Sequence, residues 1–305
     1  MPPSDARVEA QAKLNLMLRV LAREESGYHQ IETLFCRIAL SDTVTVRVTP
    51  SRRTLACSGE RLPAGGLGPP EKNLAWRAAS AYAEATGFPS GFDVSIEKRI
   101  PVGGGLGGGS ADAGGVLRAL NALNPRPIAT MQLLRIAAAL GADVPFLTQD
   151  ESTLALGWGR GERMALLPPL PSSAVWLLVP EAPVHTADAY RWLDATERPA
   201  EPAAISVNQL TTWAGVAAIA RNDFEAPVGA QVPVVGRLLA TLRGEDVRAL
   251  LGTASIVLMT GSGSCVAVVS GEQRPPHLRS PPPLSGVPVV ETETSVFVEP
   301  VVLTD

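Results

Sequence analysis

The residues from Pro101 to Ser110, PVGGGLGGGS, constrain this chain more than any other stretch. Six of the seven residues from Gly103 to Gly109 are glycine. Glycine brings no side chain to a core and loses the most conformational entropy on ordering, so the run indicates a place where backbone approaches something closely. The residues that follow, ADAGGVLRALNAL, predict a helix with Ser110 as its N-cap.

A glycine-rich loop that opens a helix is suited to binding phosphate. Its free N–H groups and the positive end of the helix dipole face the same point. The alternating segment Phe92–Ile100 predicts a strand that leads into the loop. A flexible linker or a tight turn is the alternative interpretation. Because linkers rarely lie between two such clear elements, we favour a phosphate loop.

Three common motifs do not fit this loop. A Walker A motif requires a lysine before its Ser or Thr, and the loop contains no lysine. A dinucleotide fingerprint belongs to a first strand and is followed by an acidic residue about 20 positions later, which is missing here. A hydrolase elbow, G-x-S-x-G, fails because Asp112 stands where its last glycine should be.

Composition bounds the class of protein. The 305 residues, 46% hydrophobic and 18% charged, predict a globular chain of two domains. We place the boundary before the proline-rich segment Leu166–Pro171, giving domains 1–165 and 166–305. A net charge of −4 without a Lys/Arg run argues against a nucleic-acid partner. The absence of a signal peptide, a long apolar stretch or CxxC spacing among the three cysteines predicts a cytoplasmic protein without membrane contact.

Three short segments carry further polar candidates. Lys13 and Asn15 project from one face of an alternating strand within Val8–Arg19. Tyr28 and His29 end a polar turn and suit stacking on, and hydrogen bonding to, a flat ring. Asp143 follows a helix end among apolar residues. Each also has an ordinary interpretation: a solvated strand face, a surface tyrosine, and a turn or cap residue.

The rest of the chain alternates between helices and strands. Asn73–Thr86 and Thr130–Leu140 predict helices, both ended by glycine. The glycines Gly114 and Gly115 inside the helix after the loop predict close packing on a neighbour. We expect poor order in the proline-rich stretch Gly271–Pro288. The further strands expected are Thr43–Val48, Val175–Val179, Ile256–Met259, Cys265–Val269 and Val289–Val298, and the further helices are Ser206–Arg221, Val234–Leu242 and Asp246–Leu251.

PVGGGLGGGSADAGG resembles the second motif of the GHMP kinases (galactokinase, homoserine, mevalonate and phosphomevalonate kinases). AKLNLMLRV, GYHQIETLF, LGADVPF, VHTADAY, NDFE and MTGSGSCV resemble further blocks in the expected order. They are most similar to the branch that phosphorylates 4-diphosphocytidyl-2-C-methyl-D-erythritol. Each block is modest alone, but together they span most of residues 10–268 and are highly specific.

The resemblance implies an α/β (α+β) fold of two domains, the N-terminal one ribosomal-protein-S5-like and the C-terminal one ferredoxin-like. It implies transfer of the ATP γ-phosphate, with Mg²⁺, to the C2 hydroxyl of that CDP-linked substrate in the non-mevalonate isoprenoid pathway, by a monomer or homodimer. It implies catalysis by Lys13 and Asp143, and substrate binding by Asn15, Tyr28, His29 and Thr186. The residues implied to bind ATP are Pro101, Gly103, Gly104, Gly105, Leu106, Gly107, Gly108, Gly109, Ser110, Asn73 and Lys98.

The chain departs from the family pattern at three positions near these residues. Ala111 and Asp112 replace a usual Ser and Asn, and His185 replaces a usual Ser. These departures leave the Mg²⁺ ligands undefined. Two alternatives stay open: another GHMP kinase, such as a mevalonate or homoserine kinase, and a nucleotide-binding regulatory protein without catalysis. The GYH turn argues against the first, and intact Lys13 and Asp143 argue against the second.

Overall fold

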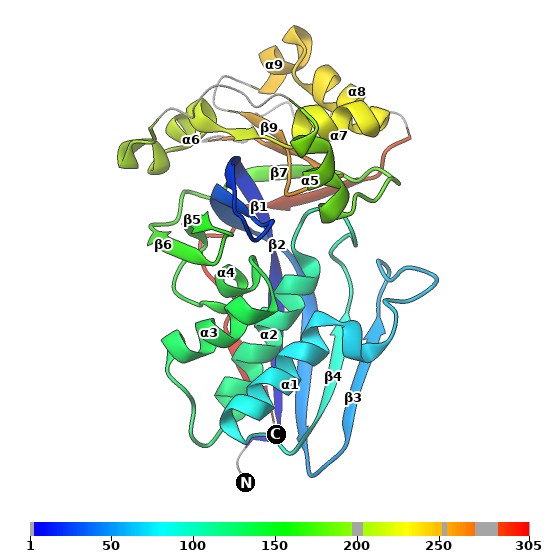
Figure 1. Ribbon diagram of the computed structural model, residues 1–305, viewed down its shortest axis with the longest axis vertical. Helices are drawn as coiled ribbons and strands as arrows, with labels where there is room; N and C mark the ends of the chain where they lie inside the picture. Colours follow the sequence, from blue (N-terminus) through cyan, green and yellow to red (C-terminus); the bar gives the residue numbers. More distant parts are fainter. Residues whose placement is uncertain (1–2, 197–203, 252–254, 272–285, 305) are drawn as a thin grey trace.

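The computed structural model describes residues 3–196, 204–251, 255–271 and 286–304. Figure 1 shows two parts, one above the other, with both chain termini at the foot of the lower part. The lower part holds α1 to α4 against a long sheet, and the upper part holds a smaller sheet covered by α5 and α7 to α9. The loop of the predicted strand–loop–helix unit lies where the two parts meet, against Thr260 and Cys265.

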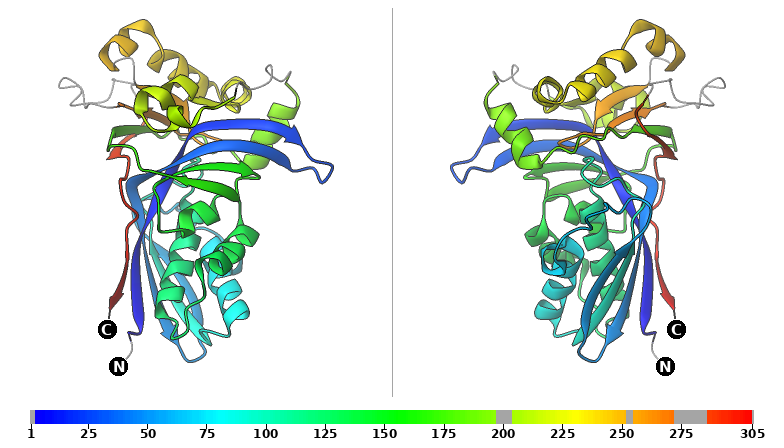
Figure 2. Two further views of the ribbon diagram at one scale, coloured as in Figure 1. Left: turned by 90° about the vertical axis from the view of Figure 1, so that its left-hand side faces the viewer. Right: turned by 90° about the vertical axis from the view of Figure 1, so that its right-hand side faces the viewer.

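The larger sheet is built on the antiparallel pair β1 (Asp5–Arg23) and β2 (His29–Thr49). Both strands run from the lower part into the upper part, where they bend and project as a hairpin (Figure 2). Three register shifts interrupt their pairing, and one of them, between Asn15 and Met17, leaves Leu16 without a partner. Such bulges bend a strand and redirect its side chains. The strand order is β12-β1-β2-β4-β3, with β5 on β2, β6 on β5 and β8 on β1.

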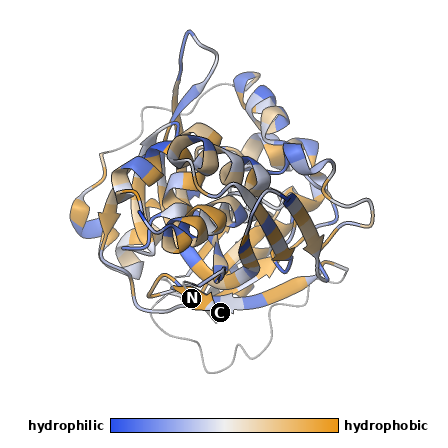
Figure 3. Cartoon of the chain, turned by 90° about the horizontal axis from the view of Figure 1, so that it is seen from below, coloured by the Kyte–Doolittle hydropathy of each residue, from blue (hydrophilic) through white to orange (hydrophobic). Residues whose placement is uncertain are grey.

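The other strands of this sheet are short. They are β3 (Arg53–Ser58), β4 (Gly91–Glu97), β5 (Leu154–Gly159), β6 (Arg163–Leu167), β8 (Arg221–Asn222) and β12 (Val301–Thr304). β12 pairs with the first residues of β1, which brings the two ends of the chain together (Figure 3).

Helices of the lower part cover one face of the sheet and contribute hydrophobic stretches to the core (orange in Figure 3). They are η1 (Pro70–Lys72), α1 (Leu74–Thr86), α2 (Gly108–Leu123), α3 (Thr130–Leu140) and α4 (Val144–Thr148). The close packing predicted for the glycines inside α2 is confirmed. A Cβ on Gly114 would lie 2.5 Å from the Leu147 carbonyl oxygen, and one on Gly115 would lie 3.3 Å from Ala10 Cβ.

The smaller sheet has the order β11-β7-β10-β9. Its strand β7 (Ala174–Leu178) turns Val175 and Leu177 toward the large core and Trp176 and Leu178 toward a second cluster under the upper helices. This alternation follows from the two-residue period of a strand. The other elements are α5 (Thr186–Asp194), η2 (Val207–Leu210), α6 (Trp213–Ile219), α7 (Glu225–Gln231), α8 (Pro233–Leu242), α9 (Glu245–Leu251), β9 (Ile256–Met259), β10 (Val266–Val269) and β11 (Val289–Glu293).

Two predicted elements are shorter than expected. The helix expected over Ser206–Arg221 is divided, because Thr212 accepts a hydrogen bond from Gly215 N and caps a new helix, α6. The strand expected over Val289–Val298 ends at Glu293. Thr294 N donates a hydrogen bond to Ser173 O, and Thr294 Oγ1 accepts one from Ser173 N, both at 2.9 Å. The chain then continues toward the larger sheet.

The predicted division into domains 1–165 and 166–305 stays a prediction. Strand β6 runs across that boundary, and β12 returns to the first sheet. Most of the proline-rich stretch Gly271–Pro288 lies outside the described residues.

Candidate active site

A pocket of about 1670 Å³ opens where the two sheets meet. The glycine-rich loop, β1, the β1–β2 turn, the start of α5 and the loop at 261–263 contribute to its wall. Every residue that the sequence suggested for catalysis or binding lines this one pocket. Those residues are Lys13, Asn15, Tyr28, His29, Asn73, Lys98, Pro101, Gly103 to Ser110, Asp143 and Thr186. Segments up to 173 positions apart in sequence are therefore neighbours in space.

Positive backbone angles explain three of the six glycines in the loop. Gly103, Gly105 and Gly107 have φ of 76°, 77° and 72°, values that residues with a side chain rarely adopt. At Gly105 a Cβ would also lie 2.1 Å from the Thr260 carbonyl oxygen. Glycine is therefore required at position 105 for two reasons: the positive φ angle and the lack of room for a Cβ atom.

The loop ends in the first turn of α2, and this corrects the predicted cap. Gly107, not Ser110, is the N-cap residue, and Ser110 lies inside the helix. Because Gly107 adopts a left-handed conformation, the chain enters the helix earlier than the serine signal indicated. Ala111 N donates to Gly107 O at 2.8 Å, so the preceding N–H groups have no acceptor within the helix. These N–H groups belong to pocket-lining residues, and free N–H groups at a helix N-terminus suit an anion such as a phosphate.

Lys13 is held at the centre of the pocket by three oxygen atoms. Its Nζ lies 2.6 Å from Asn15 Oδ1, 3.0 Å from Gly105 O and 3.2 Å from Asp143 Oδ2. Lys13 and Asn15 are each 2% exposed, which excludes the alternative of a solvated strand face. Asn15 is fixed in turn by donating Nδ2–H to Thr33 Oγ1 at 2.8 Å. The ammonium thus joins the glycine-rich loop to the carboxylate of Asp143.

Asp143 stands at the N-cap position of α4 without capping that helix through its side chain. Its side chain is 30% exposed and lines the pocket, whereas the next five residues are buried. The backbone therefore fixes Asp143 while its carboxylate faces the open pocket. This arrangement favours a site residue over an ordinary turn or cap.

Aromatic side chains gather at the far end of the pocket. The His29 ring stacks on Tyr190 with centroids 4.5 Å apart and planes inclined by 17°. His29 Nε2 lies 2.7 Å from Asp194 Oδ1. Burial, and next the nearby charge of Asp143, raises the pKa of Tyr190 to about 12, so the phenol is neutral at physiological pH. Tyr28 is exposed, and the Arg160 guanidinium lies 3.8 Å over its ring.

Tyr190, Asp194 and Arg160 line the pocket, and the sequence did not nominate them. Thr186, Tyr190 and Asp194 are spaced by four residues along α5, so they share one face of the helix. That spacing was a signal the sequence did offer. Arg160 lies in a turn between β5 and β6, where no local pattern marks it.

The loop at 261–263 packs against the glycine-rich loop. Thr260 donates its hydroxyl hydrogen to Gly105 O at 3.3 Å, and Asn222 Nδ2 donates to Gly261 O at 2.8 Å. Thr186 Oγ1 lies 3.0 Å from Ser262 Oγ, which connects α5 to the same loop.

Two residues suggested for adenosine contacts have other partners. Asn73 caps α1 by accepting a hydrogen bond from Ala75 N at 2.9 Å. Lys98 is buried between Asp42 and Asp112, 2.6 Å from Asp112 Oδ2. Burial raises the pKa of Asp112 to about 7, although the adjacent Lys98 opposes the rise. Both suggested residues still line the pocket, and their contact with adenosine stays a prediction.

No group of three or more His, Cys, Asp and Glu side chains able to hold a metal occurs among the described residues. Mg²⁺ in phosphoryl-transfer sites is usually held by one or two carboxylates together with substrate phosphates. Asp143, a partly exposed carboxylate of the pocket, fits that pattern.

The comparisons with known proteins identify the family of this chain. Residues 73–150 match the GHMP kinases N terminal domain. The chain is 40% identical over 271 residues to a 4-diphosphocytidyl-2-C-methyl-D-erythritol kinase of Moorella thermoacetica, covering 86% of this chain and 89% of the relative. The chain belongs to the 4-diphosphocytidyl-2-C-methyl-D-erythritol kinase family, a branch of the GHMP kinases. It is therefore an ATP-dependent kinase of isoprenoid precursor synthesis.

Solved structures of GHMP kinases share the fold. A crystal structure of 4-(cytidine 5'-diphospho)-2C-methyl-D-erythritol kinase is similar with a TM-score of 0.67 at 36% identity, covering 86% of this chain and 89% of that one. A mevalonate kinase is similar with a TM-score of 0.62 at 12% identity, covering 94% and 98%, and this likeness shows the fold alone. The predicted two-domain α/β class of the GHMP kinases is thus confirmed. None of the described helices has the length and apolar character needed to cross a membrane.

Proposed function

We propose that the pocket transfers the γ-phosphoryl group of ATP to the C2 hydroxyl of 4-diphosphocytidyl-2-C-methyl-D-erythritol, in the methylerythritol phosphate route to isoprenoid precursors. The observation that carries the proposal is the order of groups along the pocket. Lys13 bonds to the Gly105 carbonyl oxygen of the loop before α2 and pairs with Asp143, and the charge of Asp143 acts on Tyr190, the ring that stacks on His29. A phosphate donor, an acceptor hydroxyl and a nucleobase would need this order.

The phosphates of ATP would lie against the N–H groups at the start of α2. Phosphoryl transfer depends on positioning and on charge stabilisation more than on covalent chemistry by the protein. The N–H groups of Gly108, Gly109 and Ser110 and the dipole of α2 supply fixed positive potential there. A Mg²⁺ ion would be held chiefly by the nucleotide phosphates, whose charge it would neutralise.

Asp143 is the general base of this proposal. It accepts the proton of the C2 hydroxyl while the hydroxyl oxygen bonds to the γ-phosphorus and the bond from phosphorus to ADP breaks. Lys13, 3.2 Å from its Oδ2, positions the carboxylate and offsets charge on the phosphoryl group in transfer. Asn15 positions the Lys13 ammonium and orients the acceptor.

The cytosine would bind beside His29, Tyr190 and Tyr28. Tyr28 is the exposed aromatic ring of the turn and can stack on a base, while His29, fixed by Asp194, can hydrogen-bond to the polar edge of cytosine. Thr186, at the start of α5, would orient the sugar or diphosphate. Such a platform has no use for mevalonate or homoserine, which carry no base.

The test is ADP release from ATP with three acceptors: the CDP-linked methylerythritol, mevalonate and homoserine. We expect turnover with the first alone, and ³¹P NMR of the product should place the new phosphate on C2. Turnover with mevalonate or homoserine instead would assign another GHMP activity. ATP binding without turnover of any acceptor would identify a regulatory protein. Gel filtration of the same preparation distinguishes a monomer from a homodimer.

A further inference from the structure

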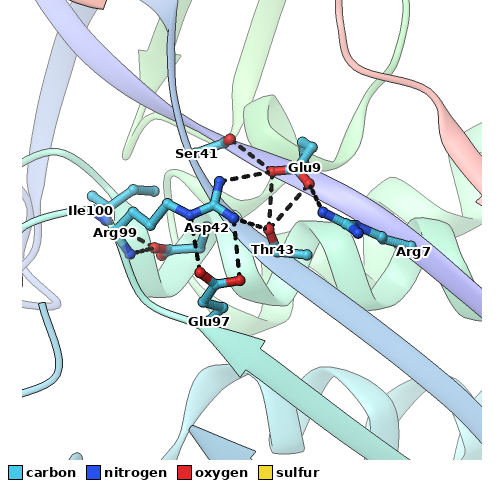
Figure 4. Close-up of polar contacts among 8 residues, drawn as sticks. All are labelled: Arg7, Glu9, Ser41, Asp42, Thr43, Glu97, Arg99 and Ile100. Carbon is cyan, nitrogen blue, oxygen red and sulfur yellow. Dashed lines mark hydrogen bonds and ion pairs between the residues drawn. The ribbon is translucent and has the colours of Figure 1, made fainter. Parts of the chain in front are cut away.

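Asp42 connects to the backbone just before the glycine-rich loop. It lies on β2, wholly buried, outside the set of pocket-lining residues. Its Oδ1 accepts hydrogen bonds from Arg99 N at 2.6 Å and Ile100 N at 2.9 Å. Figure 4 shows the Asp42 carboxylate facing these two residues. The chain leaving β4 is therefore fixed one residue before Pro101.

The other oxygen of Asp42 reaches the far side of the loop through Lys98. The Lys98 ammonium bonds to Asp42 Oδ2 and, at 2.6 Å, to Asp112 Oδ2 in α2. The side chains of Lys98 and Asp112 are 3% and 2% exposed. A Cβ on Gly108 would lie 3.6 Å from Lys98 Nζ, so this cluster sits directly beneath the start of α2. One carboxylate thus connects both ends of the loop.

The outer side of the same segment is held by the Arg99 side chain. Arg99 donates to Thr43 Oγ1 at 2.9 Å and pairs with Glu97 at 3.2 Å and Glu9 at 3.6 Å (Figure 4). The Arg99 side chain is 38% exposed. Exposed ion pairs contribute little, because water and salt screen them. The buried contacts of Asp42 are therefore the stronger restraint on this segment.

The loop itself has few means of ordering its backbone. With six glycines in seven residues, it gains little from its own side chains and loses much entropy when fixed. Its N–H groups are useful to a phosphate only if they already point to one place, since preorganised donors need no rearrangement on binding. Restraint at both ends of the loop supplies this preorganisation.

We propose that Asp42 is a positioning residue for nucleotide binding: it holds the strand end before the loop and, through Lys98, the helix start after it. The inference rests on the proposed placement of ATP phosphates at the loop. It assigns Lys98 chiefly to this cluster, and it makes Asp42 act on the nucleotide from beneath the loop without touching it. A buried ion cluster that serves stability alone is the competing explanation.

The test compares two variants. Asp42→Ala removes both the acceptor for the Arg99 and Ile100 N–H groups and the charge facing Lys98. Asp42→Asn keeps an acceptor for the two backbone N–H groups but loses the charge facing Lys98. Asn124→Ala is the matched control. Asn124 is buried at the opposite end of α2, where it donates to the Tyr82 hydroxyl oxygen at 3.0 Å. Its loss disturbs the same helix far from the loop. For each variant, calorimetry measures ADP affinity and hydrogen exchange measures protection of residues 101–110.

We expect ADP to bind about tenfold more weakly to Asp42→Ala and about threefold more weakly to Asp42→Asn. The loop should exchange faster in both, and Asn124→Ala should resemble wild type in both measurements. In turnover assays the KM for ATP should rise while the KM for the CDP-linked acceptor stays unchanged.

The proposal would be overturned in favour of general destabilisation if ADP binding were weakened equally in Asn124→Ala. It would also be overturned if the KM values for ATP and for the CDP-linked acceptor rose in parallel in the Asp42 variants. Unchanged ADP affinity in Asp42→Asn and Asp42→Ala would also overturn it. Asp42→Asn decides the question where Asp42→Ala does not fold. ADP affinity is measured without any acceptor, so these results stand apart from a failure of wild type to phosphorylate the CDP-linked compound.

Discussion

Lys13 Nζ and Asp143 Oδ2 lie 3.2 Å apart, although 130 positions separate the two residues in the chain. β1 supplies the ammonium and the start of α4 supplies the carboxylate. The ammonium is buried while the carboxylate is partly open to the pocket. This difference leaves the carboxylate able to receive a proton from a bound hydroxyl.

Replacement of Asp143 by Asn should lower kcat by about 100- to 10,000-fold, because an amide cannot accept the hydroxyl proton. Affinity for the CDP-linked substrate should change little, since the cytosine end of the pocket is untouched. Single-turnover kinetics and calorimetry measure the two quantities. Asp188→Asn, a partly exposed change on α5 outside the pocket lining, is the control and should keep wild-type kcat. Near-full turnover by a folded Asp143→Asn enzyme would remove the general-base role.

Tyr28→Ala should raise the KM for the CDP-linked substrate by roughly tenfold. Stacking of an aromatic side chain on a base contributes about 1–3 kcal/mol. The KM for ATP should stay the same, because Tyr28 lies at the opposite end of the pocket from the loop. Tyr28→Phe keeps the ring and should behave as wild type. An unchanged substrate KM in Tyr28→Ala would show that the cytosine does not use this ring.

The parts of the fold that the sequence predicted are those with local signals. The composition of residues 73–86 and the glycine after Thr86 predicted α1, and the glycine run located the loop before α2. The prediction of Ser110 as the N-cap was wrong, because Gly107, in a left-handed conformation, starts the helix three residues earlier. The bulge at Leu16 and the return of β12 to β1 depend on tertiary pairing, which no local pattern records.

The residues of the candidate site also divide into those that a local motif predicts and those that only the tertiary structure brings in. The family motifs nominated Lys13, His29 and Asp143 because each sits in a recognisable block. Tyr190 lies in the block VHTADAY but was not predicted, because its importance depends on the face of α5 that meets His29. Asp42 was missed because its partner Lys98 lies 56 positions away and nothing in its neighbourhood marks it as buried.

Asp112 predicts a dependence of stability on pH. Burial raises its pKa from the ordinary value of 3.8 to about 7, with Lys98 and Asp42 as the charged neighbours of its carboxyl. The folded state therefore holds this proton more tightly than the unfolded state. Its contribution is fully present below pH 3.8 and is lost as the pH rises through 7.

Urea unfolding of wild type and Asp112→Asn at pH 5, 6 and 7 checks this prediction. The asparagine does not titrate, so the difference in free energy of unfolding between the two proteins should change with pH. Wild type should lose stability relative to the variant toward pH 7, by at most about 1.4 kcal/mol per pH unit. Asp188→Asn should run parallel to wild type. Parallel curves for Asp112→Asn would mean that the carboxyl is ionised throughout this range.

Gly105→Ala should abolish tight nucleotide binding while the protein stays folded. The new Cβ would lie 2.1 Å from the Thr260 carbonyl oxygen, at a φ of 77° that alanine rarely adopts, so the loop must move away from the strand end that supports it. The N–H groups at the start of α2 would then lose their common direction, and the KM for ATP should rise at least about tenfold.

Gly66→Ala separates displacement of the loop from backbone strain. Gly66 has a similar φ of 70°, but a Cβ there meets nothing within 4 Å. It therefore carries the conformational penalty of about 1–2 kcal/mol without a clash. If Gly66→Ala raises the KM for ATP as much as Gly105→Ala does, backbone strain anywhere in the fold explains the weaker ATP binding. If only Gly105→Ala weakens it, the loss comes from a change in the glycine-rich loop itself and not from a left-handed alanine elsewhere in the fold.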